Sequence, residues 1–163
     1  MMRACRMLPF RLWRGEAGVS SLEVAFVLPV LLAMLFGLVE FGYNLFARST
    51  VEKAAQVGTR FAVTGEGYDT GNRVALIKDA ARPLTQVLSG STGTGVTILV
   101  RSYPNGTSAA AREDSGGDPC QTVEVQVDYR YAPLTPLVGS LLPAQLTVTG
   151  RERMVNEPWA ICK

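Results

Sequence analysis

The feature that most constrains this chain is an uncharged apolar run at residues 24–39, bracketed by Glu23 and Glu40. As a helix, the run would rise about 24 Å, against roughly 30 Å for the hydrocarbon core of a bilayer. Mostly apolar flanks on both sides extend the run far enough to span. The sequence therefore predicts a membrane helix whose lipid-embedded part covers about residues 22–47. Pro29 lies inside the run and is expected to kink or loosen the helix.

Charge is distributed unevenly around this run. Residues 1–18 hold four arginines and one glutamate, whereas the rest of the chain is almost neutral. Basic residues collect on the cytoplasmic side of membrane helices. We therefore expect a single-pass membrane protein with a cytoplasmic N-terminus and an exported C-terminal part. The net charge of +2 gives no indication of nucleic-acid binding.

The apolar run continues into an amphipathic helix. Beyond Ala47, small and apolar residues recur at helical spacing between charged ones. One helix is therefore predicted over residues 19–63, with its second half packed on an exported domain of residues 64–163. The small residues among them either seat the sheet of this domain or let a second helix approach closely. These small residues are Ala54, Ala55, Gly58 and Ala62.

The sequence of the exported part predicts one more helix and a sheet. Apolar spacing indicates a helix over residues 73–88, which we expect Pro83 to disturb. Strands are predicted at residues 96–103, 122–131 and 146–155. The middle strand alternates most cleanly, with Val123, Val125, Val127, Tyr129 and Tyr131 on one face and polar residues on the other.

These patterns together predict an α+β fold. A long N-terminal helix, transmembrane and then amphipathic, packs on the dry face of a small antiparallel sheet. The connection at residues 132–143 is apolar and rich in proline, which indicates a surface hairpin or a short helix.

The three cysteines are divided by the predicted membrane helix. Cys5 lies on the cytoplasmic side, and Cys120 and Cys162 lie in the exported part. Export to an oxidising compartment would allow a Cys120–Cys162 disulfide. It would close a loop of about 40 residues and stabilise the domain by roughly 3–4 kcal/mol. In a cytosolic domain the two thiols would instead stay unpaired.

The chain contains no histidine. This removes Ser-His-Asp and Cys-His catalysis, histidine metal sites and histidine acid–base chemistry. Carboxylate or lysine catalysis remains open, but no arrangement of these residues suggests it. We therefore expect a protein that is not an enzyme and needs no cofactor or metal.

The head of the apolar helix carries a processing signal. Gly18 ends the basic leader of residues 1–18, and Glu23 follows five residues later. Glycine lets the backbone pass extended through a protease site, and a cut after Gly18 leaves a new ammonium at Val19. Glu23 is costly in lipid unless it is paired, and the ammonium of a neighbouring subunit would pair it. One alternative is a secretory signal peptide, but the small-residue cleavage site of such peptides is missing here. The other alternative is a plain signal anchor.

Residues 15–62 resemble the TadE-like domain of tight-adherence pilus systems. The matching features are Gly18, Ser21-Leu22-Glu23, the apolar core at residues 27–32, Gly37, Glu40-Phe41-Gly42, and residues 54–62. The resemblance implies a pilin-like minor pilin or pseudopilin that is cleaved after Gly18 and takes part in pilus assembly. The implied partners are a prepilin peptidase, other pilin subunits, the inner-membrane assembly platform and membrane lipid. The protein would lie in the bacterial inner membrane, with its C-terminal domain in the periplasm or in the extracellular filament.

Several alternatives stay open. Glu40 is either a subunit contact, with Arg48 or a basic residue of another chain, or a carboxylate that reaches the lipid headgroups. The acidic loop at residues 113–118 resembles calcium-binding loops of related pseudopilins but matches no ligand spacing, so a solvated turn is also open. At the level of the whole protein, the alternatives are an uncleaved membrane-tethered adaptor or sensor, and a membrane-anchored enzyme.

Overall fold

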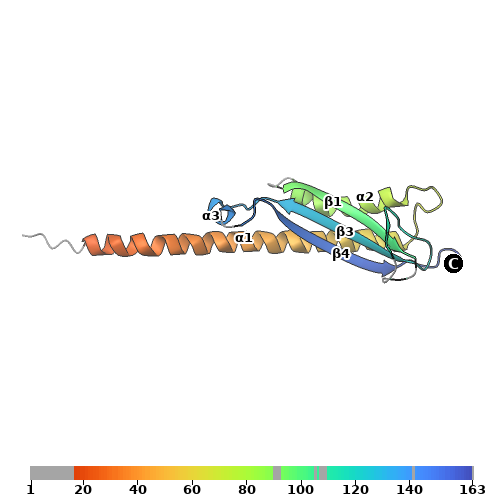
Figure 1. The fold of residues 1–163 in the computed structure, drawn as a ribbon, viewed down its shortest axis with the longest axis horizontal. Helices are drawn as coiled ribbons and strands as arrows, with labels where there is room; N and C mark the ends of the chain where they lie inside the picture. The colour runs from red at the N-terminus through yellow and green to blue at the C-terminus, as the bar shows by residue number, and fades with distance from the viewer. Residues whose placement is uncertain (1–16, 90–92, 105, 107–109, 141, 163) are drawn as a thin grey trace, which may run out of the picture. The chain divides into compact units, whose positions relative to one another are not determined.

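The computed structural model describes residues 17–89, 93–104, 106, 110–140 and 142–162 (Figure 1). Most of the predicted leader, residues 1–16, lies outside the described residues. The chain divides into two units, residues 1–35 and residues 36–163. The first helix, α1 (Ala17–Val63), contributes its N-terminal part to the first unit and the remainder to the second.

In the first unit, the side chains of residues 21–35 are all exposed, and Phe26 is 73% exposed. The helix continues without a break through Pro29. Within the described residues, α1 is the one helix long and apolar enough to cross a membrane. Its most apolar window has a mean hydropathy of 2.5, and none of that window is buried. These properties fit a single-pass membrane protein.

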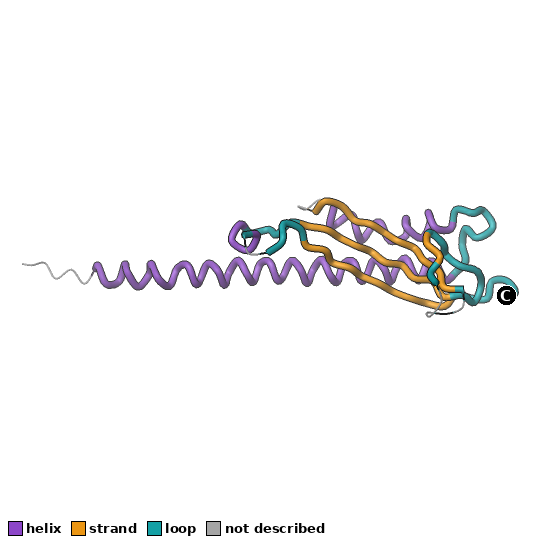
Figure 2. The backbone as a smooth tube through the Cα atoms, in the orientation of Figure 1, coloured by secondary structure: helices purple, strands orange, loops and turns teal. Residues whose placement is uncertain are grey.

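The second unit contains a four-stranded antiparallel sheet with strand order β2-β1-β3-β4 (Figure 2). The strands are β1 (Gly93–Tyr103), β2 (Arg112–Glu113), β3 (Thr122–Tyr131) and β4 (Leu146–Val155). The three predicted strands are therefore present. The two-residue strand β2 was not predicted, because so short a segment has no periodicity of its own. The predicted α+β class is confirmed: the long helix packs on a small antiparallel sheet.

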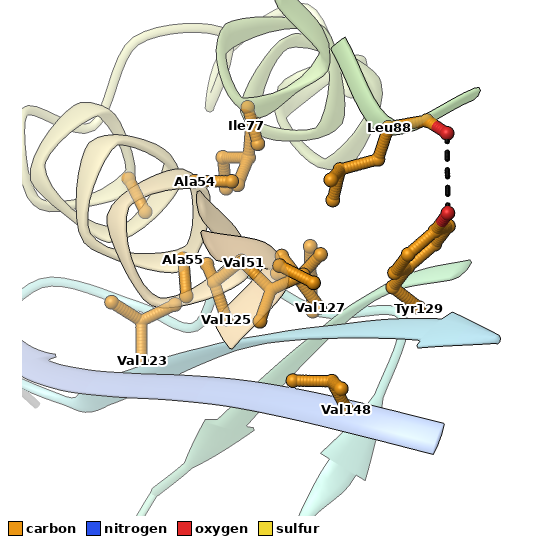
Figure 3. Close-up of a cluster of buried hydrophobic side chains, with 14 of the residues drawn as sticks. Val51, Ala54, Ala55, Ile77, Leu88, Val123, Val125, Val127, Tyr129 and Val148 are labelled. Carbon is orange, nitrogen blue, oxygen red and sulfur yellow. Dashed lines mark hydrogen bonds between the residues drawn. The ribbon is translucent and has the colours of Figure 1, made fainter. Parts of the chain in front are cut away.

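The core lies between the inner face of this sheet and the helices α1 and α2 (Arg73–Ser89) (Figure 3). The alternation in β3 is confirmed, since its five predicted inward residues from Val123 to Tyr131 are all fully buried. Ile77, Ala81 and Leu88 complete the core from α2. Contrary to the prediction, Pro83 does not disturb α2, which continues through it. Pro83 and Asp79, whose carbonyl loses its intrahelical partner, are both exposed, so water can satisfy that carbonyl.

The small residues of α1 seat the sheet and α2 of their own unit. Ala54, Ala55 and Ala62 are fully buried in the core. At Gly58, an added Cβ would lie 3.2 Å from Val125 Cγ1 and 3.4 Å from Ala81 Cβ. At Gly150 on β4, it would lie 2.5 Å from the carbonyl carbon of Val51. Of the two roles predicted for the small residues, the structure shows the packing of their own domain.

Packing of α1 in the second unit begins before the change of pattern at Ala47. The Tyr43 and Tyr129 hydroxyls are 2.8 Å apart, and Asn44 Nδ2 donates to the Tyr131 hydroxyl at 2.9 Å. Ala47 is itself fully buried. The sequence could not indicate these contacts, because Tyr129 and Tyr131 lie in a distant strand. The connection between β3 and β4 contains a short helix, α3 (Pro136–Gly139), which was one of the two predicted forms.

Candidate assembly site

The predicted assembly residue Glu23 lies on the exposed helix of the first unit. A shallow apolar groove runs along this face of α1, lined by Glu23, Val24, Val27, Leu28 and Leu31. Among the described residues, Glu23 has no hydrogen-bond or ion-pair partner. A carboxylate in such surroundings is costly in lipid unless a cation comes from outside the chain. The groove therefore combines one charge with an apolar surface suited to a second helix.

The predicted processing site lies at the beginning of α1. The backbone at Gly18 and Val19 is helical, since α1 begins at Ala17. The preceding residues lie outside the described part of the chain, and cleavage after Gly18 stays a prediction.

Glu40 has a different environment from Glu23. It is only 6% exposed, and its Oε2 accepts a hydrogen bond from the Leu134 N–H at 2.9 Å. Its Oε1 is buried and has no hydrogen-bond partner among the described residues. Arg48 does not contact Glu40 and instead donates from Nε to Glu52 Oε1 at 3.0 Å. Glu40 thus attaches the β3–β4 connection to α1, a role that the sequence did not indicate.

Cys120 and Cys162 form a disulfide at the opposite end of the sheet, with their Cα atoms 5.6 Å apart. Arg73, the first residue of α2, holds the same region together. Its guanidinium donates to the carbonyls of Gly117 and Ala62 and to Asn156 Oδ1, the last two at 2.6 and 3.1 Å. Burial lowers the pKa of Arg73 from its usual value. Arg73 therefore joins the end of α1, the disulfide loop and the C-terminal segment.

An aromatic cluster covers this arginine. The Arg73 guanidinium lies 4.5 Å from the centre of the Trp159 ring, and Tyr68 packs on Trp159 at 6.2 Å between ring centroids. The Trp159 ring packs directly on Gly65. This position requires glycine, because a Cβ would clash with the ring and because its φ is +77°. The Tyr68 hydroxyl donates to Asp118 Oδ1 at 3.0 Å, and this bond raises the pKa of Tyr68. The cluster closes the end of the domain that carries the C-terminus.

The outer face of the sheet carries a ladder of alternating charges. Arg101 bonds Glu113 at 2.7 Å and contacts Glu124 at 3.4 Å, and Arg153 bonds the other oxygen of Glu124. Glu124 lies on the predicted polar face of β3 and is only 1% exposed, because the two arginines cover it. Hydrogen bonds to these carboxylates raise the pKa values of both arginines. The ladder links all four strands, from Glu113 on β2 to Arg153 on β4.

The acidic loop at residues 113–118 lies wholly within the described part of the chain. Its carboxylates point to separate partners: Glu113 to Arg101, Asp114 to Lys78 Nζ at 2.9 Å, and Asp118 to Tyr68. No cluster of three potential ligands occurs in the part of the chain that the structure describes. The solvated-turn alternative fits these contacts.

The fold and the exposed helix define a class: an α+β protein whose described residues include one candidate membrane helix, near the N-terminus. Comparison with known families makes this more specific, because the family model for TadE-like proteins matches residues 18–60. The resemblance predicted from the sequence is therefore confirmed over this segment. No curated protein and no solved structure matches the chain. The TadE-like family indicates a protein associated with tight-adherence pili.

Proposed function

We propose that this chain is a minor pilin or pseudopilin of a tight-adherence pilus, cleaved after Gly18 and assembled through its N-terminal helix. The main support for this proposal is the position of the family match in the chain. It begins at residue 18, the predicted processing residue, and covers the exposed apolar helix with Glu23. A structural role agrees with the absence of histidine from the sequence.

The chemistry of assembly follows from the groove around Glu23. Cleavage after Gly18 places an ammonium at Val19, about one helical turn from Glu23. Within lipid, each charge needs an opposite charge nearby, and removal of one partner of a buried ion pair typically costs about 3–5 kcal/mol. If the ammonium of one subunit pairs with Glu23 of its neighbour, only one stagger of the two helices satisfies both charges. The apolar residues of the groove supply the contact area, and the ion pair specifies the register.

The same proposal assigns partners and location. The leader would stay in the cytoplasm, where a prepilin peptidase cuts it at the surface of the inner membrane. Residues 64–163 would lie in the periplasm or the filament, where the Cys120–Cys162 disulfide is chemically stable. Other pilin subunits and the inner-membrane assembly platform would receive the cleaved chain.

Cleavage is tested by the N-terminus of the mature protein. Mass spectrometry of membrane-extracted chain, from cells that contain the peptidase, should find Val19 as the first residue. Gly18→Val should block cleavage, because its side chain would fill the space that glycine leaves for close approach of the backbone to the protease. Gly37→Ala is the matched control, since its added Cβ meets no atom within 4 Å. A chain that keeps its initiator methionine in the presence of the peptidase would favour the uncleaved adaptor or sensor and refute the proposal.

A further inference from the structure

A second apolar surface lies at the end of the sheet where β3 leaves and β4 begins. Residues 131–150 contain no charged side chain. Within this stretch, Leu134 is 37% exposed and Leu142 is 42% exposed, and Pro136 and Pro143 are exposed as well. Such a long uncharged and exposed connection is unusual on a water-facing surface, because exposed loops are normally polar.

This connection is attached to α1. The Leu134 N–H bonds Glu40, and a groove between the two segments is lined by Gly37, Phe41, Val138, Leu142 and other residues. In Figure 1, α3 lies beside the part of α1 that belongs to the second unit. Phe41 is itself 62% exposed. The described residues of this loop, 132–140 and 142–145, therefore bring exposed apolar side chains next to Phe41.

We propose that the described part of this loop, residues 132–140 and 142–145, inserts together with Phe41 into the interfacial layer of the bilayer through which α1 passes. The inference rests on the membrane anchorage in the proposed function. Glu40 directly follows the uncharged run of residues 24–39. A bilayer that contains this run therefore ends within about one turn, or 5 Å, of Glu40 along the helix. Because Leu134 is bonded to Glu40, the loop is held at that boundary.

The length of the apolar run supports this placement. The run rises about 24 Å, whereas the hydrocarbon core is about 30 Å thick. The remaining apolar height comes from residues at the two ends of the run, either in the helix itself or packed beside it. Leu134, Leu142 and Phe41 supply apolar area at the Glu40 end. The loop thus extends the apolar band by packing beside α1.

The same contact explains how a carboxylate is tolerated at the edge of the bilayer. A glutamate that faces lipid is costly unless it is paired or hydrogen-bonded. Glu40 is covered by the loop and accepts its Leu134 N–H, so the charge does not face the acyl chains. The loop then presents leucine and proline where the carboxylate would otherwise be exposed.

The groove alone would also suit an apolar helix of a second copy. The exposed apolar surface, however, extends beyond the groove, since Leu134 and Pro136 do not line it. A helix seated in the groove would leave these residues in water. A lipid surface covers all of them at once, so lipid is the occupant that fits.

Photo-crosslinking of the full chain in vesicles of phosphatidylethanolamine and phosphatidylglycerol tests the inference. A benzoylphenylalanine replaces Leu142 in one variant and Val155 in the control. Val155 is 62% exposed, and it ends the strand that begins beside the loop. Mass spectrometry should find lipid adducts at residue 142 and several-fold fewer at residue 155. A second variant labelled at residue 134 should behave like the one at 142.

Carbonate extraction of the same vesicles distinguishes failure of the loop inference from failure of the membrane anchorage on which it rests. If the chain resists extraction but residues 134 and 142 give no more lipid adduct than 155, the loop inference is refuted and the anchored helix stands. If the adducts at 142 are dimers of the chain, the groove holds a second copy and the inference is again refuted. Release of the chain by carbonate would overturn the membrane anchorage and the inference with it.

Discussion

Gly150 is the position at which the packing of α1 on the sheet can be tested most directly. Its absent side chain faces the backbone of α1: a Cβ would lie 2.5 Å from Val51 C and 2.6 Å from both Val51 O and Glu52 N. Favourable contacts between carbon atoms begin at about 3.5 Å, so Gly150→Ala requires the helix and the strand to separate by about 1 Å. No flexible side chain can move aside to relieve this contact.

The expected cost is the upper end of the range for an overpacked core, about 3 kcal/mol. With a typical urea dependence of about 2 kcal/mol per molar, the midpoint of unfolding should fall by roughly 1.5 M. The measurement is urea unfolding of the full chain in detergent micelles, followed by near-ultraviolet circular dichroism of the core tyrosines. The slope should be unchanged, since the same surface becomes exposed on unfolding.

Two further variants make the result specific. Gly42→Ala lies on the same helix, and its Cβ would meet no atom within 4 Å. It should therefore stabilise the helix by up to about 1 kcal/mol, the usual gain of alanine over glycine. Val51→Ala should not rescue Gly150→Ala, because the contacts are with backbone atoms of Val51 and not with its side chain. An unchanged midpoint in Gly150→Ala would refute the close approach of α1 to β4.

Three other predictions concern assembly and the distal end of the domain. Glu23→Ala should impair piliation strongly while leaving cleavage largely intact. The control Glu66→Ala, which removes an exposed carboxylate, should leave piliation normal. Normal filaments in Glu23→Ala would exclude the proposed pairing. Cys120→Ser should destabilise the domain by about 4 kcal/mol in the chain-entropy account, since the bond joins residues separated by 42 positions. The bond itself should appear as a mobility shift between reduced and non-reduced alkylated protein in electrophoresis. Tyr68 should ionise above the usual tyrosine pKa of 10.0, so the stability from its bond to Asp118 is present below pH 10 and lost as the pH rises through the raised pKa. Tyr68→Phe should remove one step that lies above the usual value from the tyrosinate absorbance titration, and an unchanged titration would contradict the bond.

Local pattern was sufficient to predict the main elements of the fold. The alternation from Thr122 to Tyr131 specifies a half-buried strand, because every second residue is apolar and either β-branched or aromatic. The helix at Arg73–Ser89 was predicted for the same reason, from its apolar spacing. Its continuity through Pro83 was not, since the sequence does not show that the freed carbonyl faces water. Local rules therefore predict elements better than they predict interruptions.

The distal cluster could not be predicted, because its members come from separated segments. Arg73 bonds Gly117, Ala62 and Asn156, and no spacing along the chain relates these four positions. One signal was available. An arginine in the first turn of a helix opposes the helix dipole, and α2 has no acidic residue there. Such an arginine indicates a tertiary partner, although it does not identify which one.

The two glutamates that bracket the apolar run look equivalent in the sequence, and the structure separates them by their partners. Glu23 is exposed on an apolar groove and has no partner among the described residues, so its charge is available to another subunit. Glu40 already accepts a hydrogen bond from its own chain and is covered by the loop. A neighbouring cation would have to displace this loop to reach Glu40, at the cost of a buried hydrogen bond. In the proposed function, specificity of subunit register therefore belongs to Glu23, whereas Glu40 attaches the β3–β4 connection to α1.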